Sequence, residues 1–407
     1  MLVYGDGERQ CDPAGLCAAI SADIEACLAA PAGLSRHQRL VSAFIIAGEL
    51  VQGLADARFA ARQADDWTTV DAAGTAFLLE LARAGGLSWD SGFAASPMLP
   101  PDWRERLFAL AEPPLVTIRR PEGYAFYALY PEAYHAAARR SGLGPQTRVI
   151  GIRSIGTGLA AMVAAALGAA APITLRPVGH PYGRRPEIAP ALAERVLGDT
   201  HADFAIVDEG PGLSGSSFGG VADWLVDHGV PEERLHFFPG HGGPLGPQAR
   251  AEHRQRWDRR PRHVIDFDAL VLHAERPDHR LEAWLVDLLG PLAAPPEDIS
   301  GGGWRRLVRA LKQAAGNGTH ARALDRAMDA RVERAFTWRH GPAAGDAADA
   351  PAISPAPAPP SALPSAYTAP RVNRAQLARL LDSWAAARPP PRAGGRARTV
   401  ARLGVKG

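Results

Sequence analysis

The middle of the chain alternates short apolar runs with longer segments in which apolar residues recur every three or four positions. The short runs predict β-strands and the periodic segments predict α-helices. Because this alternation is typical of a mostly parallel sheet covered by helices on both faces, we expect an α/β fold. The predicted strands span residues 115–120, 124–130, 148–152, 172–176, 203–208, 234–238 and 262–267, and the predicted helices span 131–140, 157–167, 188–197 and 216–228.

Helical periodicity without strands flanks this region on both sides. Near the N-terminus, Ser35 and Gln38 form a candidate capping box for one helix. Another helix is expected to start near Thr75 and to end at the pair Gly85 and Gly86. The pattern divides the chain into a helical segment (1–112), an α/β domain (113–275), a second helical segment (276–341), an Ala/Pro-rich linker (342–370) and a short helix with a basic tail (371–407).

The composition, 46% hydrophobic and 22% charged residues, is that of a globular protein. Lys312 and Lys406 are the only lysines, so a cation that meets a phosphate in this chain is expected to be an arginine. The basic stretch 250–263 and the basic tail are interpreted as solvated surfaces, and we expect no nucleic-acid partner. A further charged stretch is also interpreted as a solvated helix face, and it contains Asp56, Arg58, Arg62 and Asp65.

All three cysteines lie near the N-terminus without a CxxC spacing, so neither a zinc site nor a disulfide framework is expected, and a reducing cytoplasm suits the chain. The first ten residues lack the apolar core of a secretory signal. The longest apolar run, 159–175, is interrupted by Gly168 and Pro172 and therefore predicts a buried helix followed by a strand rather than a membrane span.

Two of the predicted strands run into turns that contain Gly and Ser and that each precede a helix. We name residues 153–156 the first turn and residues 208–217 the second turn. Backbone N–H groups at such helix starts bind phosphate, so two of these turns in one sheet predict a ligand with phosphate at both ends. Asp208 and Glu209 open the second turn, where an acidic pair can bind sugar hydroxyls, a divalent cation, or both.

The second turn resembles the PRPP-binding motif of type I phosphoribosyltransferases, in which an apolar strand, two acidic residues and a short loop precede Ser/Thr-Gly-x-Ser/Thr at a helix start. Residues 151–179 resemble the diphosphate loop, helix and strand of the adenine and orotate members. The segment HPYGRR (180–185) lies where that family carries a mobile loop over the reacting centre. The resemblance covers roughly residues 115–270.

The resemblance implies a role for each matching position. The acidic pair would hold the ribose hydroxyls and, through PRPP, Mg²⁺. The 5′-phosphate would be bound by Leu213, Ser214, Gly215, Ser216 and Ser217, and the diphosphate by Arg153, Ser154, Ile155 and Gly156. The arginines that the sequence brings nearest to the diphosphate are Arg176, Arg184 and Arg185, and the candidate catalytic residues are Asp208, Glu209, Arg184 and Arg185. The second turn departs from the family by one extra residue and by Pro211, which has no N–H.

These residues support two functions. The first is transfer of a phosphoribosyl group to or from a nitrogenous base, in which protein groups orient the nucleophile and neutralise the departing diphosphate. The second is a module that senses PRPP or a nucleotide without turnover, with helical flanks that recruit a partner. A nucleotide hydrolase or kinase ranks lower because the chain has no GxxxxGK[ST] loop. A homodimer remains open, and no membrane partner is expected.

Overall fold

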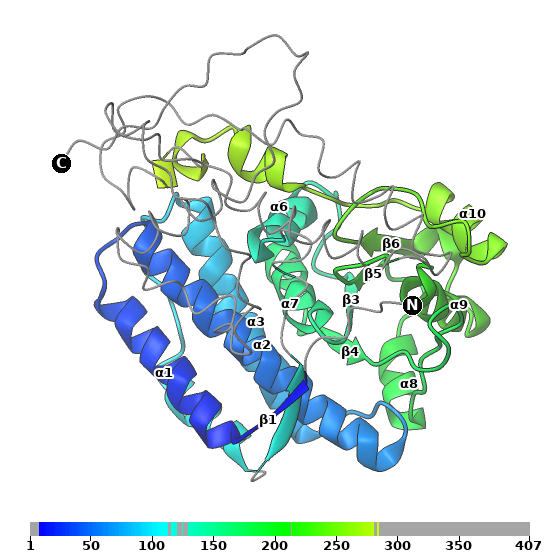
Figure 1. The fold of residues 1–407 in the computed structure, drawn as a ribbon, viewed down its shortest axis with the longest axis horizontal. Helices are drawn as coiled ribbons and strands as arrows, with labels where there is room; N and C mark the ends of the chain where they lie inside the picture. The colour runs from blue at the N-terminus through cyan, green and yellow to red at the C-terminus, as the bar shows by residue number, and fades with distance from the viewer. Residues whose placement is uncertain are drawn as a thin grey trace, which may run out of the picture.

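The computed structural model describes residues 8–112, 115–119, 124, 129–212, 214–280 and 283–284. Within these ranges the chain is a mixed α/β structure with a four-stranded parallel sheet flanked by helices (Figure 1). The strands are β3 (Arg148–Ile152), β4 (Ile173–Leu175), β5 (Phe204–Val207) and β6 (Leu235–Phe238), in the spatial order β4-β3-β5-β6. The expected α/β class and parallel sheet are therefore confirmed.

The strand order contains one reversal, between β3 and β5. The chain leaves β3, forms β4 on one side of it, and then crosses to form β5 on the other side. Accordingly, Ile150 in β3 pairs with Ile173 in β4 and with Ile206 in β5. In open α/β sheets, ligands bind outside the carboxyl ends of the strands at such a switch point. The first and second turns follow β3 and β5, so they occupy this position.

Alternate residues of the strands face two separate hydrophobic clusters, as the two-residue period of a strand requires. In β5, Ala205 and Val207 belong to one cluster, and Phe204 and Ile206 to the other. The first cluster includes α6 (Pro131–Arg139) and α7 (Gly156–Leu167), and the second includes α8 (Pro190–Leu197), α9 (Ser216–Asp227) and α10 (Ala251–Arg259). The two groups of helices cover opposite faces of the sheet (Figure 1).

The N-terminal helices share the first cluster with α6 and α7. They are α1 (Pro13–Ala29), α2 (Leu34–Arg62), α3 (Thr69–Asp90) and the short α4 (Trp103–Phe108). Helix α2 lies against α7 so closely that a Cβ on Gly48 would be 3.8 Å from the Cα of Gly158. The hydrophobic core therefore continues from the N-terminal helices, which end before residue 112, into the α/β region that follows. Shorter turns complete the described chain at Ala109–Ala111, Glu232–Arg234 and Pro277–His279 (3₁₀) and at Asp268–Leu272 (π).

Three of the predicted strands differ from those observed. Only β2 (Val116–Arg119) forms within 115–120, and it pairs antiparallel with β1 (Glu8–Cys11) outside the parallel sheet. In 124–130, Tyr124 is helical and 129–130 are irregular, while 125–128 lie outside the described residues. In 262–267, only Arg262 bridges to β6, because Asp266 accepts the N–H of Ala269 and starts the π turn instead.

The N-terminal helix boundaries also differ from the prediction. Helix α2 begins at Leu34 after Gly33, and no side chain caps it, so the capping box expected at Ser35 is wrong. The capping box that forms joins Thr68 and Asp71 at the start of α3. Helix α3 continues through Gly85 and Gly86, where the ring of His135 occupies the space that a Cβ on Gly86 would take. The predicted helices that follow residue 284 lie outside the described residues.

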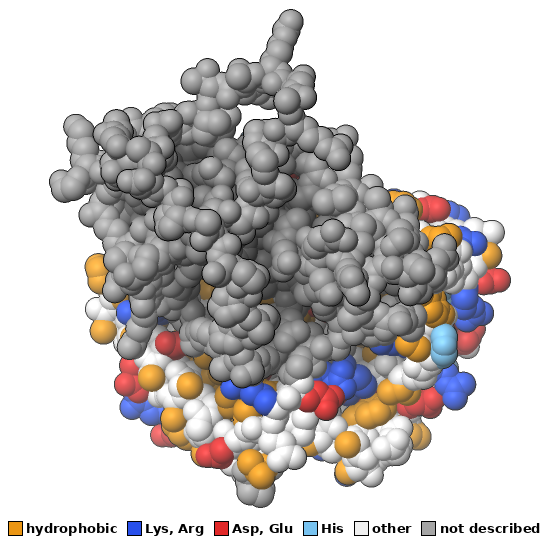
Figure 2. Space-filling model, viewed as in Figure 1, with side chains coloured by type: hydrophobic (Ala, Val, Ile, Leu, Met, Phe, Trp, Pro, Cys, Tyr) orange, Lys and Arg blue, Asp and Glu red, His pale blue; other side chains and the backbone are white. Residues whose placement is uncertain are grey.

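By length and composition, α2 is the one helix in the described ranges that could cross a membrane. In this fold it is a core helix, since 78% of its most apolar 18-residue stretch is buried inside the protein. Basic and acidic side chains are interspersed over the described surface that is visible in Figure 2.

Candidate functional site

The first and second turns meet at the carboxyl edge of the sheet. Gly156, the first residue of α7, lies directly beside the end of β5: a Cβ at this position would be 2.7 Å from the carbonyl oxygen of Val207 and 3.5 Å from Oδ1 of Asp208. Only glycine permits this close approach. The two segments that the sequence analysis singled out therefore lie side by side.

The acidic pair is half-buried at this edge. The hydroxyl of Tyr134 donates a hydrogen bond to the carbonyl oxygen of Asp208 at 2.8 Å. The N–H of Asp208 donates to the carbonyl oxygen of Phe238 at 3.2 Å. Burial, and secondly the negative charge of Glu209, raises the pKa of Tyr124 well above its usual value. The backbone of Asp208 is thus fixed between α6 and β6, and Tyr124 lies within electrostatic range of Glu209.

The serines of the second turn are largely held by the protein itself. The hydroxyls of Ser214 and Ser216 are buried and donate to the carbonyl oxygen of Pro181 at 2.8 and 2.6 Å. Gly215 adopts φ 61° and lies against the side chain of Leu245. Two of the serines expected at a phosphate therefore anchor the segment 178–185, while Leu213 lies outside the described residues.

The segment 178–185 is a tight turn that lies on the second turn. Its ends pair through two hydrogen bonds, of 2.8 and 2.9 Å, between Val178 and Arg185. Nη1 of Arg184 donates to Oγ of Ser217 at 3.2 Å, which brings the guanidinium to the start of α9 rather than to the first turn. Arg185 is mostly exposed and pairs with Glu187 at 2.8 Å.

Arg153 and Arg176 lie at the first turn, in a network of ion pairs with Asp56 and Asp65. Nε of Arg153 is 2.7 Å from Oδ1 of Asp56, and Nε of Arg176 is 2.9 Å from the same oxygen. The second carboxylate, Asp65, pairs with Arg153 and also accepts the backbone N–H of Arg176 at 2.6 Å. Burial by itself would raise the pKa of Asp56, but the two guanidinium groups outweigh it and lower this pKa to about 2. Asp56 is therefore ionised at neutral pH, whereas burial raises the pKa of Asp65.

The same arginines shape the first turn. Nη1 of Arg176 donates to the carbonyl oxygen of Arg153 at 2.9 Å, and its guanidinium lies 3.4 Å from Oγ of Ser154. The backbone of Asp65 extends the network. Its N–H donates to the carbonyl oxygen of Glu187 at 2.7 Å, and its carbonyl oxygen accepts the N–H of Ala189 at 2.8 Å. Asp65 thereby connects the first turn to the segment that follows residue 185.

The interpretation of the charged stretch as a solvated face is wrong for two of its members. Asp65 is only 3% exposed, and the side chain of Asp56 is 19% exposed, whereas Arg62 lies on the surface. Their partners are 88 to 120 residues away in the sequence. No local pattern could have indicated these pairs, because the arginines and their carboxylates come together only in the folded chain.

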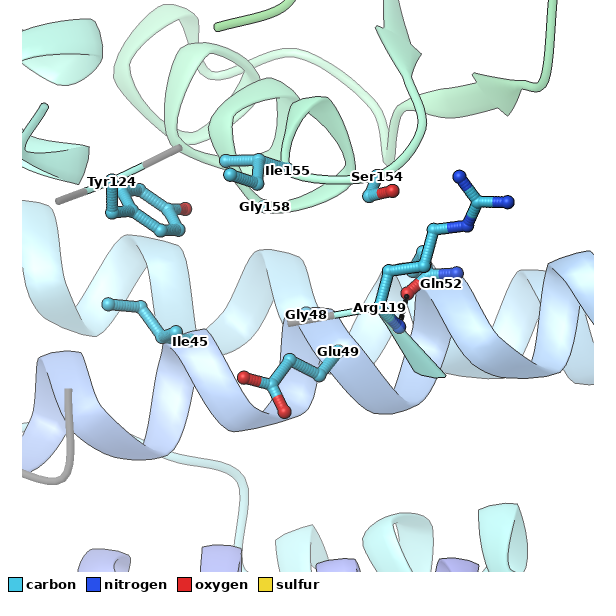
Figure 3. Close-up of a pocket in the computed structure, with 9 residues that line it drawn as sticks. All are labelled: Ile45, Gly48, Glu49, Gln52, Arg119, Tyr124, Ser154, Ile155 and Gly158. Atoms are coloured by element: carbon cyan, nitrogen blue, oxygen red, sulfur yellow. Dashed lines mark hydrogen bonds between the residues drawn. The ribbon is translucent and has the colours of Figure 1, made fainter. Parts of the chain in front are cut away.

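A pocket adjoins the first turn on the side of α2 (Figure 3). The centre of a water-sized sphere can occupy about 20 Å³ of it. Figure 3 shows Ser154 and Ile155 on one side, α2 on the other, and Tyr124 and Arg119 at opposite ends. Gln52 accepts the N–H of Arg119 at 3.1 Å. The complete lining comprises Ile45, Gly48, Glu49, Gln52, Arg119, Tyr124, Ser154, Ile155 and Gly158.

The acidic pair is the candidate in this site for binding a magnesium ion that arrives with a phosphorylated ligand. Mg²⁺ in proteins is usually held by one or two carboxylates together with phosphate oxygens and water. Asp208 and Glu209 offer two such carboxylates at the turn. The residues that the structure describes contain no group of three or more His, Cys, Asp or Glu side chains that could hold a metal without the ligand's own oxygens.

Comparisons of the chain with protein-family models, with curated proteins and with solved structures found no match.

Proposed function

We propose that the protein binds a phosphorylated ribose, as PRPP or a nucleotide with Mg²⁺, between the first and second turns. One observation carries the proposal: the turns that follow β3 and β5 lie together at the switch point of the sheet, with Gly156 against Asp208. The N–H of Ser216 already donates to Oγ of Ser214 at 3.2 Å. A phosphate at the start of α9 would therefore meet the N–H groups of Ser217 and Phe218 and the guanidinium of Arg184. Asp208 and Glu209 would then receive the ribose hydroxyls and Mg²⁺.

The contacts of the turns favour binding over turnover. Group transfer requires cations that are free to meet the departing diphosphate. Arg153 and Arg176 are instead paired with Asp56, and the hydroxyls of Ser214 and Ser216 hold Pro181. These side chains preorganise the turns, as a binding site requires. We therefore propose a sensing or carrier role for the site.

Removal of the acidic pair should abolish ligand binding. In the wild-type protein, a phosphorylated ribose with Mg²⁺ at 100 times its dissociation constant should stabilise the fold by roughly 2.7 kcal/mol. Thermal unfolding should show this as a rise in the melting temperature for at least one of PRPP, ribose 5-phosphate and AMP. The double variant Asp208→Asn, Glu209→Gln should show no rise, because it lacks the carboxylates that receive the ribose hydroxyls and Mg²⁺.

The matched control removes the same number of charges from exposed positions, with Asp227→Asn and Glu233→Gln. It should retain the full rise in melting temperature. If the acidic-pair variant kept the rise while its circular dichroism matched the wild type, the ligand would bind elsewhere. If none of the three ligands shifted the wild-type protein, the proposed function would be wrong.

Transfer of the phosphoribosyl group to or from a nitrogenous base is the second candidate. It is favoured by the position of the segment 178–185, which lies on the second turn and carries Arg184 and the exposed Arg185. Incubation of the protein with PRPP, Mg²⁺ and a panel of nitrogenous bases would distinguish the candidates. We expect no release of diphosphate above the protein-free rate, and base-dependent release would establish the transferase.

A further inference from the structure

The cations of the first turn are already neutralised by carboxylates. Arg153 pairs with Asp56 and Asp65, and Arg176 pairs with Asp56. The side chains of Arg153 and Arg176 are only 2% and 15% exposed. A diphosphate at this turn would have to displace a buried carboxylate from its guanidinium, which leaves that carboxylate buried and unpaired.

Among the residues that the structure describes, the surroundings of the first turn supply no excess positive charge. Arg119 lines the adjoining pocket and pairs with Glu8 at 2.8 Å. Glu49, on the same pocket, is paired with Arg9 at 3.3 Å. On the other side, the carboxylate of Asp208 lies beside Gly156. An anion at the first turn would therefore meet paired arginines and one close carboxylate.

The second turn has the opposite character. Arg184 donates to Ser217 at the start of α9, and among the ion pairs of the described residues none includes Arg184. Helix α9, from Ser216 to Asp227, also directs the positive end of its dipole to this position. The positive charge available to a ligand is thus concentrated at one end of the site.

We propose that the site selects a ribose with a single phosphate, such as ribose 5-phosphate or a nucleoside 5′-monophosphate, and gives no preference to the diphosphate of PRPP. The phosphate lies at the start of α9 near Arg184, and the anomeric end of the ribose points to the neutralised first turn. This inference rests on the proposed function and names the class of ligand for the same site.

Titration calorimetry of the full chain with Mg²⁺ tests the inference with ribose 5-phosphate and PRPP, which differ only in the diphosphate. PRPP should bind no more tightly than ribose 5-phosphate. Tighter binding of PRPP, beyond the error of the titration, would overturn the inference and leave the proposed function standing. Failure of both ligands to bind would overturn the inference together with the proposed function.

A variant tests the physical cause. Asp56→Asn removes the carboxylate that Arg153 and Arg176 share, so the affinity for PRPP relative to ribose 5-phosphate should rise roughly tenfold. The matched control Asp102→Asn removes a surface partner of Arg106 and should leave the ratio unchanged. An unchanged or lower ratio in Asp56→Asn would overturn the role of the buried carboxylate. If Asp56→Asn does not fold, the wild-type comparison decides the inference by itself.

Discussion

Replacement of Asp65 with alanine should lower the free energy of unfolding by about 3 kcal/mol, because it leaves the buried guanidinium of Arg153 without one of its two carboxylates. The backbone N–H of Arg176 loses its acceptor as well. Urea denaturation would measure the loss as a lower midpoint with an unchanged slope. A buried position explains the size of this effect, since the side chains of Asp65 and Arg153 are each 2% exposed.

Two further variants separate the ion pair from other consequences of the substitution. Glu25→Ala removes a carboxylate from a surface pair with Arg104, and it should cost less than about 1 kcal/mol. Arg153→Met, introduced together with Asp65→Ala, should restore part of the stability because it removes the uncompensated charge. An Asp65→Ala protein as stable as the wild type would show that the network contributes nothing to the fold.

Gly156→Val should both destabilise the protein and abolish ligand binding. The new Cβ would lie 2.7 Å from the carbonyl oxygen of Val207, and this atom belongs to the backbone of β5 and cannot rotate away. We expect a loss of about 1–3 kcal/mol in the free energy of unfolding. Because the two turns must separate, the affinity for a phosphorylated ribose should fall at least roughly tenfold, as calorimetry would measure.

Gly144→Val is the matched control for this substitution. A Cβ on Gly144 would meet no atom within 4 Å, so both stability and affinity should remain close to those of the wild type. If the Gly156→Val protein folded and bound its ligand normally, the first turn would not be part of the site.

The sheet could be predicted because its strands are buried on both faces. The runs that became β3 and β5 are largely apolar and are followed by Gly-containing turns, so the local pattern alone indicated that they are strands. The strand expected at 115–120 forms as β2 but lies outside the parallel sheet. Its partner is β1, more than a hundred residues earlier in the sequence, and no local signal indicates that pairing.

The sequence predicted which segments form the candidate site, but not the contacts that their side chains make. The sequence indicated both turns and the acidic pair, and the structure brings these segments together. It did not indicate that Pro181 accepts the hydroxyls of Ser214 and Ser216, or that Asp56 neutralises the arginines. Such contacts depend on which distant segments meet in the fold. The identity of a residue shows only which groups its side chain is able to bind, and not which group it meets.

The hydrophobic cluster that joins α2 and α3 to α7 has a consequence for cooperativity. Apolar side chains of the N-terminal helices and of Val149, Ala205 and Phe238 in the sheet belong to one continuous interior. Removal of the first 112 residues would expose the apolar face of α7 to water, so we expect the sheet not to fold on its own. The amides of α2 and of β3 should then exchange with solvent through the same global opening of the molecule.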